Sequence, residues 1–291
     1  MTAVPWRPHA ATPGAGERPA RGAVRIDRVV KYYGEGPGAV LAVDDCSLDV
    51  RPGEIFVVVG PSGCGKTTLL HAIAGFHPLS GGAIYLDEEL LCGPGKPTAD
   101  LGADRVVVFQ NGALFPWKTI LENVALGPRL RGAMTRDEAI ARARRMLVDS
   151  GLEGYENAYP AETSSGVARR VEIVRALINE PAVILLDEPF RALDSLTKSM
   201  MHSTLLAIQA RSRATVFFIT HDIEEAVFLA GRVAVMTSRP GRLKAIVEVG
   251  LPYPRSPEIV VSPAFRELVQ KTTEFVREEA VKAYKLGDKE G

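Results

Sequence analysis

One stretch of the sequence carries residues that could hold a phosphate chain and a metal ion. It reads Gly60-Pro61-Ser62-Gly63-Cys64-Gly65-Lys66-Thr67-Thr68 and matches the pattern G-x-x-x-x-G-K-S/T. Glycines let backbone N–H groups wrap a phosphate chain, and a following helix turns its positive end to the same anion. Lys66 would reach the β- and γ-phosphates, and Thr67 would place its hydroxyl on Mg²⁺. This pattern, flanked by Ile55–Val59 and an apolar helical run, predicts a nucleotide phosphate site rather than a plain glycine-rich turn.

Two carboxylates follow a second apolar run, Val183–Leu186. A short apolar run of this kind is typical of a buried parallel strand whose C-terminal end meets a ligand. We expect Asp187 to hold Mg²⁺ through water and Glu188 to polarise the water that attacks the γ-phosphate. Alone, the pair could equally be an acidic turn. The phosphate loop in the same chain favours the catalytic interpretation.

Two further strand-like runs end in polar residues. Gln110 follows Arg105–Phe109, and His221 follows Ala214–Ile219, which we take as the final core strand. A lone histidine at a strand end is usually structural. Here Gln110, Glu188 and His221 would project from the same sheet edge as the phosphate loop, so we expect these strand ends to contact a phosphate.

The elements that must position these residues are read from apolar periodicity and turn signals. Short strands are predicted at Val24–Val30, Val40–Val43, Cys46–Val50 and Ala83–Leu86, with a loop over 87–104 and a helix over 223–230. Thr135 and Glu138 form a capping-box pattern at the start of a helix that extends to Gly151. Ser262-Pro263 predicts the start of a C-terminal helix.

Composition narrows the class of protein. Lysine plus arginine equals aspartate plus glutamate at 35 each, so nothing in the net charge indicates a nucleic-acid partner. No apolar run approaches the roughly 20 residues of a membrane span, so we expect a soluble or peripheral protein. The three cysteines show neither metal-ligand spacing nor an even disulfide framework, and Cys64 is better explained as a small loop residue than as a reactive thiol. Residues 1–22 are predicted to be a disordered leader.

Two adjacent aromatic residues, Tyr32 and Tyr33, follow the first predicted strand. Either ring could stack on an adenine. Packing at a strand end explains the pair equally well from spacing alone.

The chain resembles the ATP-binding subunits of ABC transporters, most closely the importer branch for nitrate, sulfonates and taurine. The resemblance runs from about residue 24 to 285. It rests on ordered motifs of that family: Gly60–Thr68 (Walker A), Val108-Phe109-Gln110 (Q-loop), Val183–Pro189 (Walker B), Ala192-Leu193-Asp194 (D-loop) and His221 (switch histidine). The branch is indicated by Phe115-Pro116-Trp117, Asn123-Val124, Ala158-Tyr159-Pro160, Asp187–Phe190 and Arg239–Arg242.

The resemblance implies an α/β fold with a RecA-like P-loop core sheet, an antiparallel β part, an inserted helical subdomain and a C-terminal helical extension. We expect the ATPase domain over 23–245, its helical subdomain over about 111–178 and the extension over 246–291. The resemblance also favours Tyr33 over Tyr32 as the adenine-stacking residue. It implies that ATP and Mg²⁺ are the cofactors and that Thr67, Asp187 and Gln110 hold the metal. It also implies that Gln110, Glu188, His221 and Lys66 act in catalysis.

The family also implies partners. Two copies would enclose two ATP molecules, each held between the phosphate loop of one copy and the signature segment Ser164-Ser165-Gly166, with Asp194, of the other. Hydrolysis would then drive membrane permease subunits at the cytoplasmic face of the membrane, with a substrate-binding protein as an indirect partner. The transported compound would be a small anion.

Two departures from the family pattern bear on activity. Ser165 stands where the signature carries its first glycine, and Arg191 replaces a glycine common before the D-loop. A side chain at 165 restricts the backbone conformations in which the N–H groups can face the partner's γ-phosphate. We therefore expect an active but slowed ATPase. The alternatives are tolerated drift with normal turnover, a signature-degenerate subunit that binds ATP but hydrolyses it slowly or not at all, and a soluble non-transport ABC ATPase. The single cassette and the lack of sustained heptads disfavour the last of these.

Overall fold

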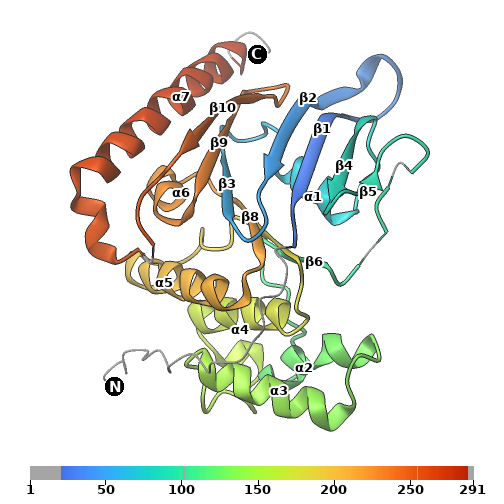
Figure 1. The fold of residues 1–291 in the computed structure, drawn as a ribbon, viewed down its shortest axis with the longest axis vertical. Coiled ribbons are helices and arrows are strands. Elements are labelled where there is room, and N and C mark those ends of the chain that lie inside the picture. The colour runs from blue at the N-terminus through green and yellow to red at the C-terminus, as the bar shows by residue number, and fades with distance from the viewer. Residues whose placement is uncertain (1–20, 97, 101, 254, 288–291) are drawn as a thin grey trace.

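A six-stranded sheet positions the predicted site residues (Figure 1). Its strand order is β10 (Leu243–Glu248), β9 (Arg232–Met236), β3 (Ile55–Val59), β8 (Thr215–Ile219), β7 (Val183–Asp187) and β6 (Arg105–Val108). All pairs are parallel except β9 with β10. The computed structural model describes residues 21–96, 98–100, 102–253 and 255–287.

The central strands are apolar throughout because both faces of the sheet are covered. In β3, Phe56 and Val58 belong to one core cluster, whereas Ile55, Val57 and Val59 belong to the cluster on the other face. Successive side chains of a strand point to opposite faces, so a strand buried on both sides needs an uninterrupted apolar run. This confirms the buried parallel strand predicted at 183–186 and explains the apolar run at 55–59.

Different elements cover the two faces of the sheet. On one side lie α1 (Lys66–Ala74) and an antiparallel sheet of order β2 (Val40–Val50), β1 (Val24–Tyr33), β4 (Gly81–Leu86) and β5 (Glu89–Cys92). On the other lie α5 (Ser195–Ser212), α6 (Ile223–Leu229) and α7 (Pro263–Gly287). α7 follows the 3₁₀ turn Pro257–Val261 and begins at Pro263, as the Ser262-Pro263 pair predicts.

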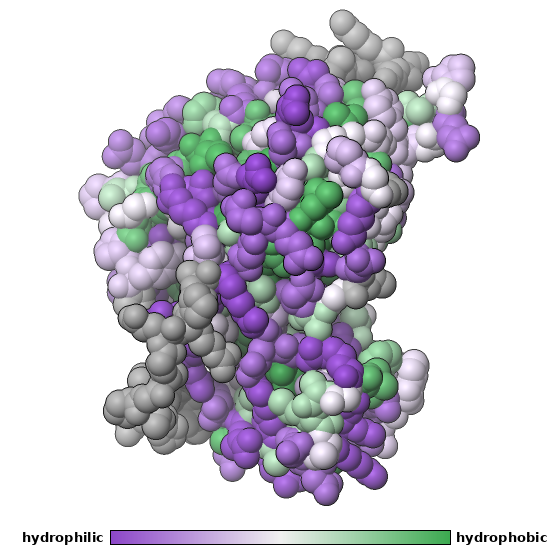
Figure 2. Space-filling view, turned by 45° about the vertical axis from the view of Figure 1, so that its right-hand side comes forward, coloured by the Kyte–Doolittle hydropathy of each residue, from purple (hydrophilic) through white to green (hydrophobic). Residues whose placement is uncertain are grey.

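A helical part carries its own core. It contains α2 (Ile120–Leu130), α3 (Arg136–Asp149) and the outer face of α4 (Ser165–Leu177), and it forms the lower part of the molecule in Figure 1. The capping box predicted at Thr135 is confirmed, because its hydroxyl accepts from the Glu138 N–H at 3.3 Å and the Glu138 carboxylate accepts from the Thr135 N–H at 2.8 Å. The face seen in Figure 2 is mainly hydrophilic over both parts, with smaller hydrophobic patches.

Three strand predictions were wrong. The separate strands 40–43 and 46–50 are one strand, β2, which continues through Asp45 at a positive φ of 47° where the register with β1 shifts. The loop over 87–104 contains β5, which pairs with β4 through a tight turn at Asp87-Glu88. Both turn residues adopt positive φ without glycine, so the usual hairpin signal was missing.

The third wrong prediction concerns the end of the sheet. The strand ending at Ile219 is not the final one, since β9 and β10 follow it in sequence and complete the sheet on the other side of β3. β10 also crosses the expected domain boundary at 245. Most of the expected leader, residues 1–20, lies outside the described residues. None of the described helices combines the length and apolar character needed to cross a membrane.

Candidate nucleotide site

The phosphate loop joins β3 to α1 at the carboxyl edge of the central sheet. The helix start at Gly65 has a left-handed φ of 91° and no side-chain cap. By contrast, α2 to α6 each begin with a side chain that accepts a backbone N–H: Thr119, Thr135, Ser164, Asp194 and Asp222. The first N–H groups of α1 are therefore open to an external anion, as phosphate binding requires.

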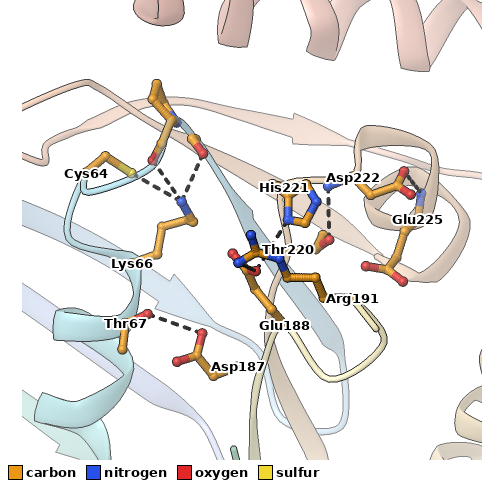
Figure 3. Close-up of polar contacts among 12 residues, drawn as sticks. Cys64, Lys66, Thr67, Asp187, Glu188, Arg191, Thr220, His221, Asp222 and Glu225 are labelled. Carbon is orange, nitrogen blue, oxygen red and sulfur yellow. Dashed lines mark hydrogen bonds and ion pairs between the residues drawn. The ribbon is translucent and has the colours of Figure 1, made fainter. Parts of the chain in front are cut away.

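Lys66 is buried and turned back into the loop. Its ammonium donates to the carbonyls of Gly60 and Pro61, both at 2.9 Å, and lies 3.7 Å from the Cys64 sulfur (Figure 3). Burial raises the pKa of the Cys64 thiol, although the neighbouring lysine acts in the opposite direction. Cys64 is thus a protonated, packed loop residue, in agreement with the interpretation as a loop filler.

Thr67 and Asp187 face each other across the site. The Thr67 hydroxyl donates to Asp187 Oδ1 at 3.2 Å, and burial raises the pKa of that carboxyl, although the Thr67 hydrogen bond opposes the shift. No group of three His, Cys, Asp or Glu side chains that could cage a metal occurs among the described residues. One hydroxyl and one carboxylate nevertheless fit Mg²⁺, which typically takes its other ligands from water and substrate phosphates.

Glu188 is held from two sides. Its Oε2 lies 3.1 Å from Arg191 Nη1 and 3.4 Å from His221 Nδ1 (Figure 3). Its backbone adopts a positive φ of 42°, and its N–H donates to the Ile219 carbonyl of β8 at 3.0 Å. Left-handed backbone at a non-glycine residue is strained and needs support from its surroundings. Here the neighbouring strand and two cationic or polar side chains supply that support.

Gln110 lies just past the end of β6 with an exposed side chain. Its position is fixed by Arg169 of α4, whose guanidinium donates to the carbonyls of Phe109 and Gln110, each at 2.7 Å. Arg169 is itself buried and paired with Glu172 at 2.6 Å. The sequence analysis did not identify Arg169. In the sequence it stands out only as one of two adjacent arginines, Arg169 and Arg170, and nothing there indicates that it is buried.

Tyr33 stands next to the last threonine of the phosphate loop. Its hydroxyl donates to the Thr68 hydroxyl at 3.3 Å, and 38% of the residue is exposed. The ring is flanked by His77 at 5.8 Å and by the Lys31 ammonium at 5.0 Å. This half-exposed ring beside the loop supports the adenine-stacking role, which stays a prediction.

The predicted signature residues lie elsewhere on the surface. Ser164 caps α4 by accepting the Val167 N–H at 3.3 Å, and both Ser164 and Ser165 are exposed. Gly166 is packed against α5, since a β-carbon there would lie 2.6 Å from Thr197 Cγ2. Asp194 caps α5 by accepting the Thr197 N–H at 3.0 Å, and this bond lowers the pKa of the Asp194 carboxyl.

Two groups can be distinguished among the predicted residues, with Gln110 and Tyr33 outside both. The phosphate side comprises Lys66, Thr67, Asp187, Glu188 and His221, which meet at the ends of β3, β7 and β8. The signature side comprises Ser164–Gly166 and Asp194, which share Thr197 as a neighbour. In the described part of the chain, no hydrogen bond or ion pair joins the two groups.

A polar network behind His221 was also not predicted. Lys198 of α5 donates to Asp222 at 2.5 Å and lies 3.6 Å from Glu225, which contacts His202 at 2.7 Å. Burial would raise the pKa of Asp222, but the Lys198 hydrogen bond holds it below the usual value. Since Asp222 directly follows His221 and Lys198 lies one turn after Asp194, this network connects the start of α5 to the segment that carries His221.

Comparison with known proteins gives consistent results. The ABC transporter family matches residues 43–191. An aliphatic sulfonates import ATP-binding protein of Bacillus cereus is 38% identical over 248 residues, which is 85% of this chain and 93% of the relative. A taurine import ATP-binding protein of Rhizobium johnstonii is 45% identical over 223 residues, covering 76% and 82%. A dimeric ATP-binding cassette bound to ADP and Pi superposes with a TM-score of 0.66 at 32% identity, covering 79% of this chain and all of that one.

Proposed function

This chain belongs to the ABC transporter family as an ATP-binding, ATP-hydrolysing import subunit, and we propose that its turnover uses a sandwich of two copies that drives a permease for a small anion. The phosphate side would bind MgATP, with Lys66 on the β- and γ-phosphates. Thr67, Asp187 and Gln110 would hold Mg²⁺, which would neutralise charge on the phosphates.

The observation that carries this proposal is the meeting of Glu188 and His221 at the edge where the phosphate loop ends. Glu188 Oε2 is 3.4 Å from His221 Nδ1, and its strained backbone is fixed to β8. In the proposed mechanism Glu188 accepts a hydrogen bond from the attacking water and orients it, while His221 and Lys66 stabilise the charge that develops on the γ-phosphate.

The need for a second copy is supported by the separation of the two sides. The exposed amino end of α4, at Ser164 and Ser165, faces solvent rather than the phosphate loop of its own chain. Among the described residues, the Ser164 hydroxyl accepts only the Val167 N–H of this helix start, so the preceding N–H groups can still bind an anion supplied by another molecule. The dimeric relative with ADP and Pi bound agrees with this arrangement.

Slow hydrolysis is supported by two departures. Ser165 places a side chain at the exposed start of α4. Arg191, whose side chain is 58% exposed, pairs with the Glu188 Oε2 atom that would otherwise accept a hydrogen bond from the attacking water. An exposed ion pair contributes at most about 1 kcal/mol, so Arg191 would slow the reaction without stopping it.

The permease would dock near Gln110 and residues 111–135, at the cytoplasmic face of a membrane. Exposed aromatic side chains support this position: Phe109 stacks on Phe76 at 5.9 Å, and Trp117 is 69% exposed. The transported compound would be an anion such as nitrate, a sulfonate or taurine, because related import subunits are named for sulfonates and taurine. A substrate-binding protein would deliver it to the permease.

ATPase activity and gel filtration in ATP and Mg²⁺ test the proposal, using the native protein and Glu188→Gln. We expect measurable turnover for the native protein, a loss of at least about 100-fold for Glu188→Gln, and an ATP-dependent dimer of the variant. Glu224→Gln, which removes an exposed carboxylate of α6, is the matched control and should keep native turnover.

Turnover without any nucleotide-dependent dimer, even for Glu188→Gln, would contradict the two-copy sandwich. Native activity in Glu188→Gln would contradict the role of that carboxylate. The substrate class is tested separately, by stimulation of the ATPase in complex with its permease and binding protein when sulfonates, taurine or nitrate are added.

A further inference from the structure

The C-terminal helix buries a carboxylate on a stripe that is otherwise neutral. Phe265, Thr272 and Glu279 recur every seven residues on the face of α7 turned to the protein, and each is at most 2% exposed. Figure 1 shows α7 along the β9–β10 side of the central sheet. A buried carboxylate is costly unless its oxygens are paired, so its contacts indicate what it does.

Glu279 makes three polar contacts. Its Oε2 accepts from the backbone N–H of Ser238 at 3.1 Å, while Oε1 accepts from Lys244 at 2.9 Å and from Lys282 at 2.7 Å. Lys244 lies on β10, and Ser238 lies in the 237–242 loop that joins β9 to β10. One side chain of α7 therefore holds both the loop and the strand that follows it.

The 237–242 loop is internally bonded. The Thr237 N–H donates to the Arg242 carbonyl at 2.9 Å, and the Thr237 hydroxyl donates to the Pro240 carbonyl at 2.8 Å. Arg242 is also paired with Asp44 of β2. Because these cross-links join the two ends of the loop, we expect a displacement of Ser238 to displace Gly241 as well.

That other end is pressed against the phosphate loop. Gly241 approaches so closely that a β-carbon there would lie 2.0 Å from the Cys64 carbonyl oxygen. A β-carbon on Gly63 would lie 2.8 Å from Arg239 Nη2, so the guanidinium rests on the phosphate loop as well. Gly241 is further fixed to β2, because its N–H donates to the Ala42 carbonyl and its own carbonyl accepts the Asp44 N–H, each at 3.0 Å.

We propose that Glu279 is a positioning residue for nucleotide binding, which holds the phosphate loop in its binding shape through Ser238 and the 237–242 loop. The inference rests on the proposed function, since it assigns to α7 a role in the site that binds MgATP. Under this proposal the C-terminal extension affects phosphate binding through the 237–242 loop, although α7 itself lies outside the site.

The consequence differs from that of a purely structural contact. In Glu279→Gln one carboxylate oxygen becomes an NH₂ donor, and the two lysine ammonium groups hold the oxygen that remains. The Ser238 N–H then loses its acceptor, and the outer wall of the phosphate loop loosens. Backbone N–H groups that are less well placed bind the phosphates more weakly. Glu188 and His221 approach from β7 and β8 instead, so the rate at saturating ATP should change little.

The test compares Glu279→Gln with Glu278→Gln in the full-length protein. Glu278 is the matched control because it pairs with the same Lys244, at 2.6 Å, but is 62% exposed and does not contact Ser238. A fluorescent ADP analogue gives Kd, and steady-state ATPase gives KM and kcat, at a temperature where circular dichroism shows each variant folded. For Glu279→Gln we expect Kd and KM to rise about fivefold, which corresponds to about 1 kcal/mol, with kcat within about twofold of native. Glu278→Gln should match the native protein.

An unchanged Kd in folded Glu279→Gln would overturn the inference, as would an equal rise in Glu278→Gln. If Glu279→Gln does not fold, Glu279→Asp provides the test. The flexible Lys244 and Lys282 side chains can follow the shorter carboxylate, whereas the Ser238 backbone N–H cannot. The Kd of Glu279→Asp should then rise, and a native Kd would overturn the inference. Failure of the native protein to bind the ADP analogue would instead contradict the proposed function.

Discussion

The polar side chains of the phosphate side have partners within the chain, whereas the serines of the signature side face solvent. On the phosphate side, every charged group already has a partner: Lys66 binds loop carbonyls, Asp187 accepts from Thr67, and Glu188 lies between Arg191 and His221. On the signature side, Ser164 and Ser165 are exposed, and their helix start caps itself without touching the phosphate loop. One chain thus brings the phosphate-side residues together, whereas in the proposed mechanism its signature side acts on a nucleotide held by another copy.

This comparison separates two kinds of experimental effect. Changes on the phosphate side should alter nucleotide binding by a single copy. Changes on the signature side should leave that binding intact and alter only steps that need two copies, namely dimer formation and turnover. Each prediction below tests this separation.

The largest effect is expected for Lys66→Ala. The buried ammonium donates to the Gly60 and Pro61 carbonyls of the phosphate loop, and the variant would remove the positive charge of the loop itself. We expect kcat/KM for ATP to fall roughly 10³-fold, in line with the loss of a preorganised donor. Binding of nucleotide by the single copy, measured by fluorescence titration, should fall with it.

Lys271→Ala, on the exposed face of α7, serves as the control and should be indistinguishable from native. If Lys66→Ala bound nucleotide normally and lost only dimer formation, the phosphate side would not be a self-sufficient binding site, and the comparison would fail.

A large pH effect is expected from the support behind the phosphate side. The Lys282, Lys244 and Ser238 contacts hold the pKa of Glu279 at about 2, against an ordinary 4.5, although burial alone would raise it. The folded-state pKa is therefore depressed, so the carboxylate stabilises the fold above about pH 4.5 and that stability is lost as the pH falls toward 2. The contribution is about 3 kcal/mol.

Urea unfolding between pH 2.5 and 7 measures this contribution. The free energy of unfolding of the native protein should fall through the acid range more steeply than that of Glu279→Gln, while Glu278→Gln should follow the native curve. If the free energy of unfolding changed with pH equally in the native protein and in Glu279→Gln, the contacts of this carboxylate would not stabilise the fold.

The phosphate side could be predicted almost completely from sequence. Lys66, Asp187, Glu188 and His221 each follow a short apolar run, and the carboxyl ends of parallel strands meet at one edge, so strand order was not needed to bring them together. The same local signals predicted the helix caps at Thr135 and the start of α7. These features depend on residues close in sequence.

The connections between elements could not be predicted in this way. Arg169 holds the Q-loop carbonyls 59 and 60 residues away, Lys198 reaches Asp222 across 24 residues, and Glu279 reaches Ser238 across 41. Nothing near these residues in the sequence indicates their partners, because the pairing arises from the packing of α4 on β6, α5 on α6 and α7 on β9 and β10. Likewise, β5 was missed because its turn, Asp87-Glu88, contains no glycine.

On the signature side, Gly166→Ala should mainly destabilise the protein. The new β-carbon would lie 2.6 Å from Thr197 Cγ2, and the β-branched threonine has little rotamer freedom on a helix. We expect a loss of about 1–3 kcal/mol in the free energy of unfolding, with the Kd for nucleotide unchanged in the folded protein. The double variant with Thr197→Ser, which removes the clashing methyl group, should recover most of the loss.

Ala168→Gly is a control at a position of the same helix that lacks the Thr197 contact. Its free energy of unfolding should fall by no more than the difference in helix propensity, about 1 kcal/mol. A Gly166→Ala protein of native stability would mean that α4 and α5 are not packed as closely as described. A changed nucleotide Kd would mean that the signature side already takes part in binding by one copy.

The smallest effect, and the sharpest test of the comparison, is expected for Ser165→Gly. Ser165 is exposed in the first turn of α4, and its side chain makes no hydrogen bond with the residues that the structure describes. Removing this side chain should open the backbone N–H groups to a phosphate held by another copy. We expect kcat to rise about threefold, which is less than 1 kcal/mol, while the Kd of the single copy stays native. Unchanged turnover would show that Ser165 does not slow the reaction. A tighter Kd at protein concentrations too low for dimers would place residue 165 on the phosphate side and remove the distinction between the two regions.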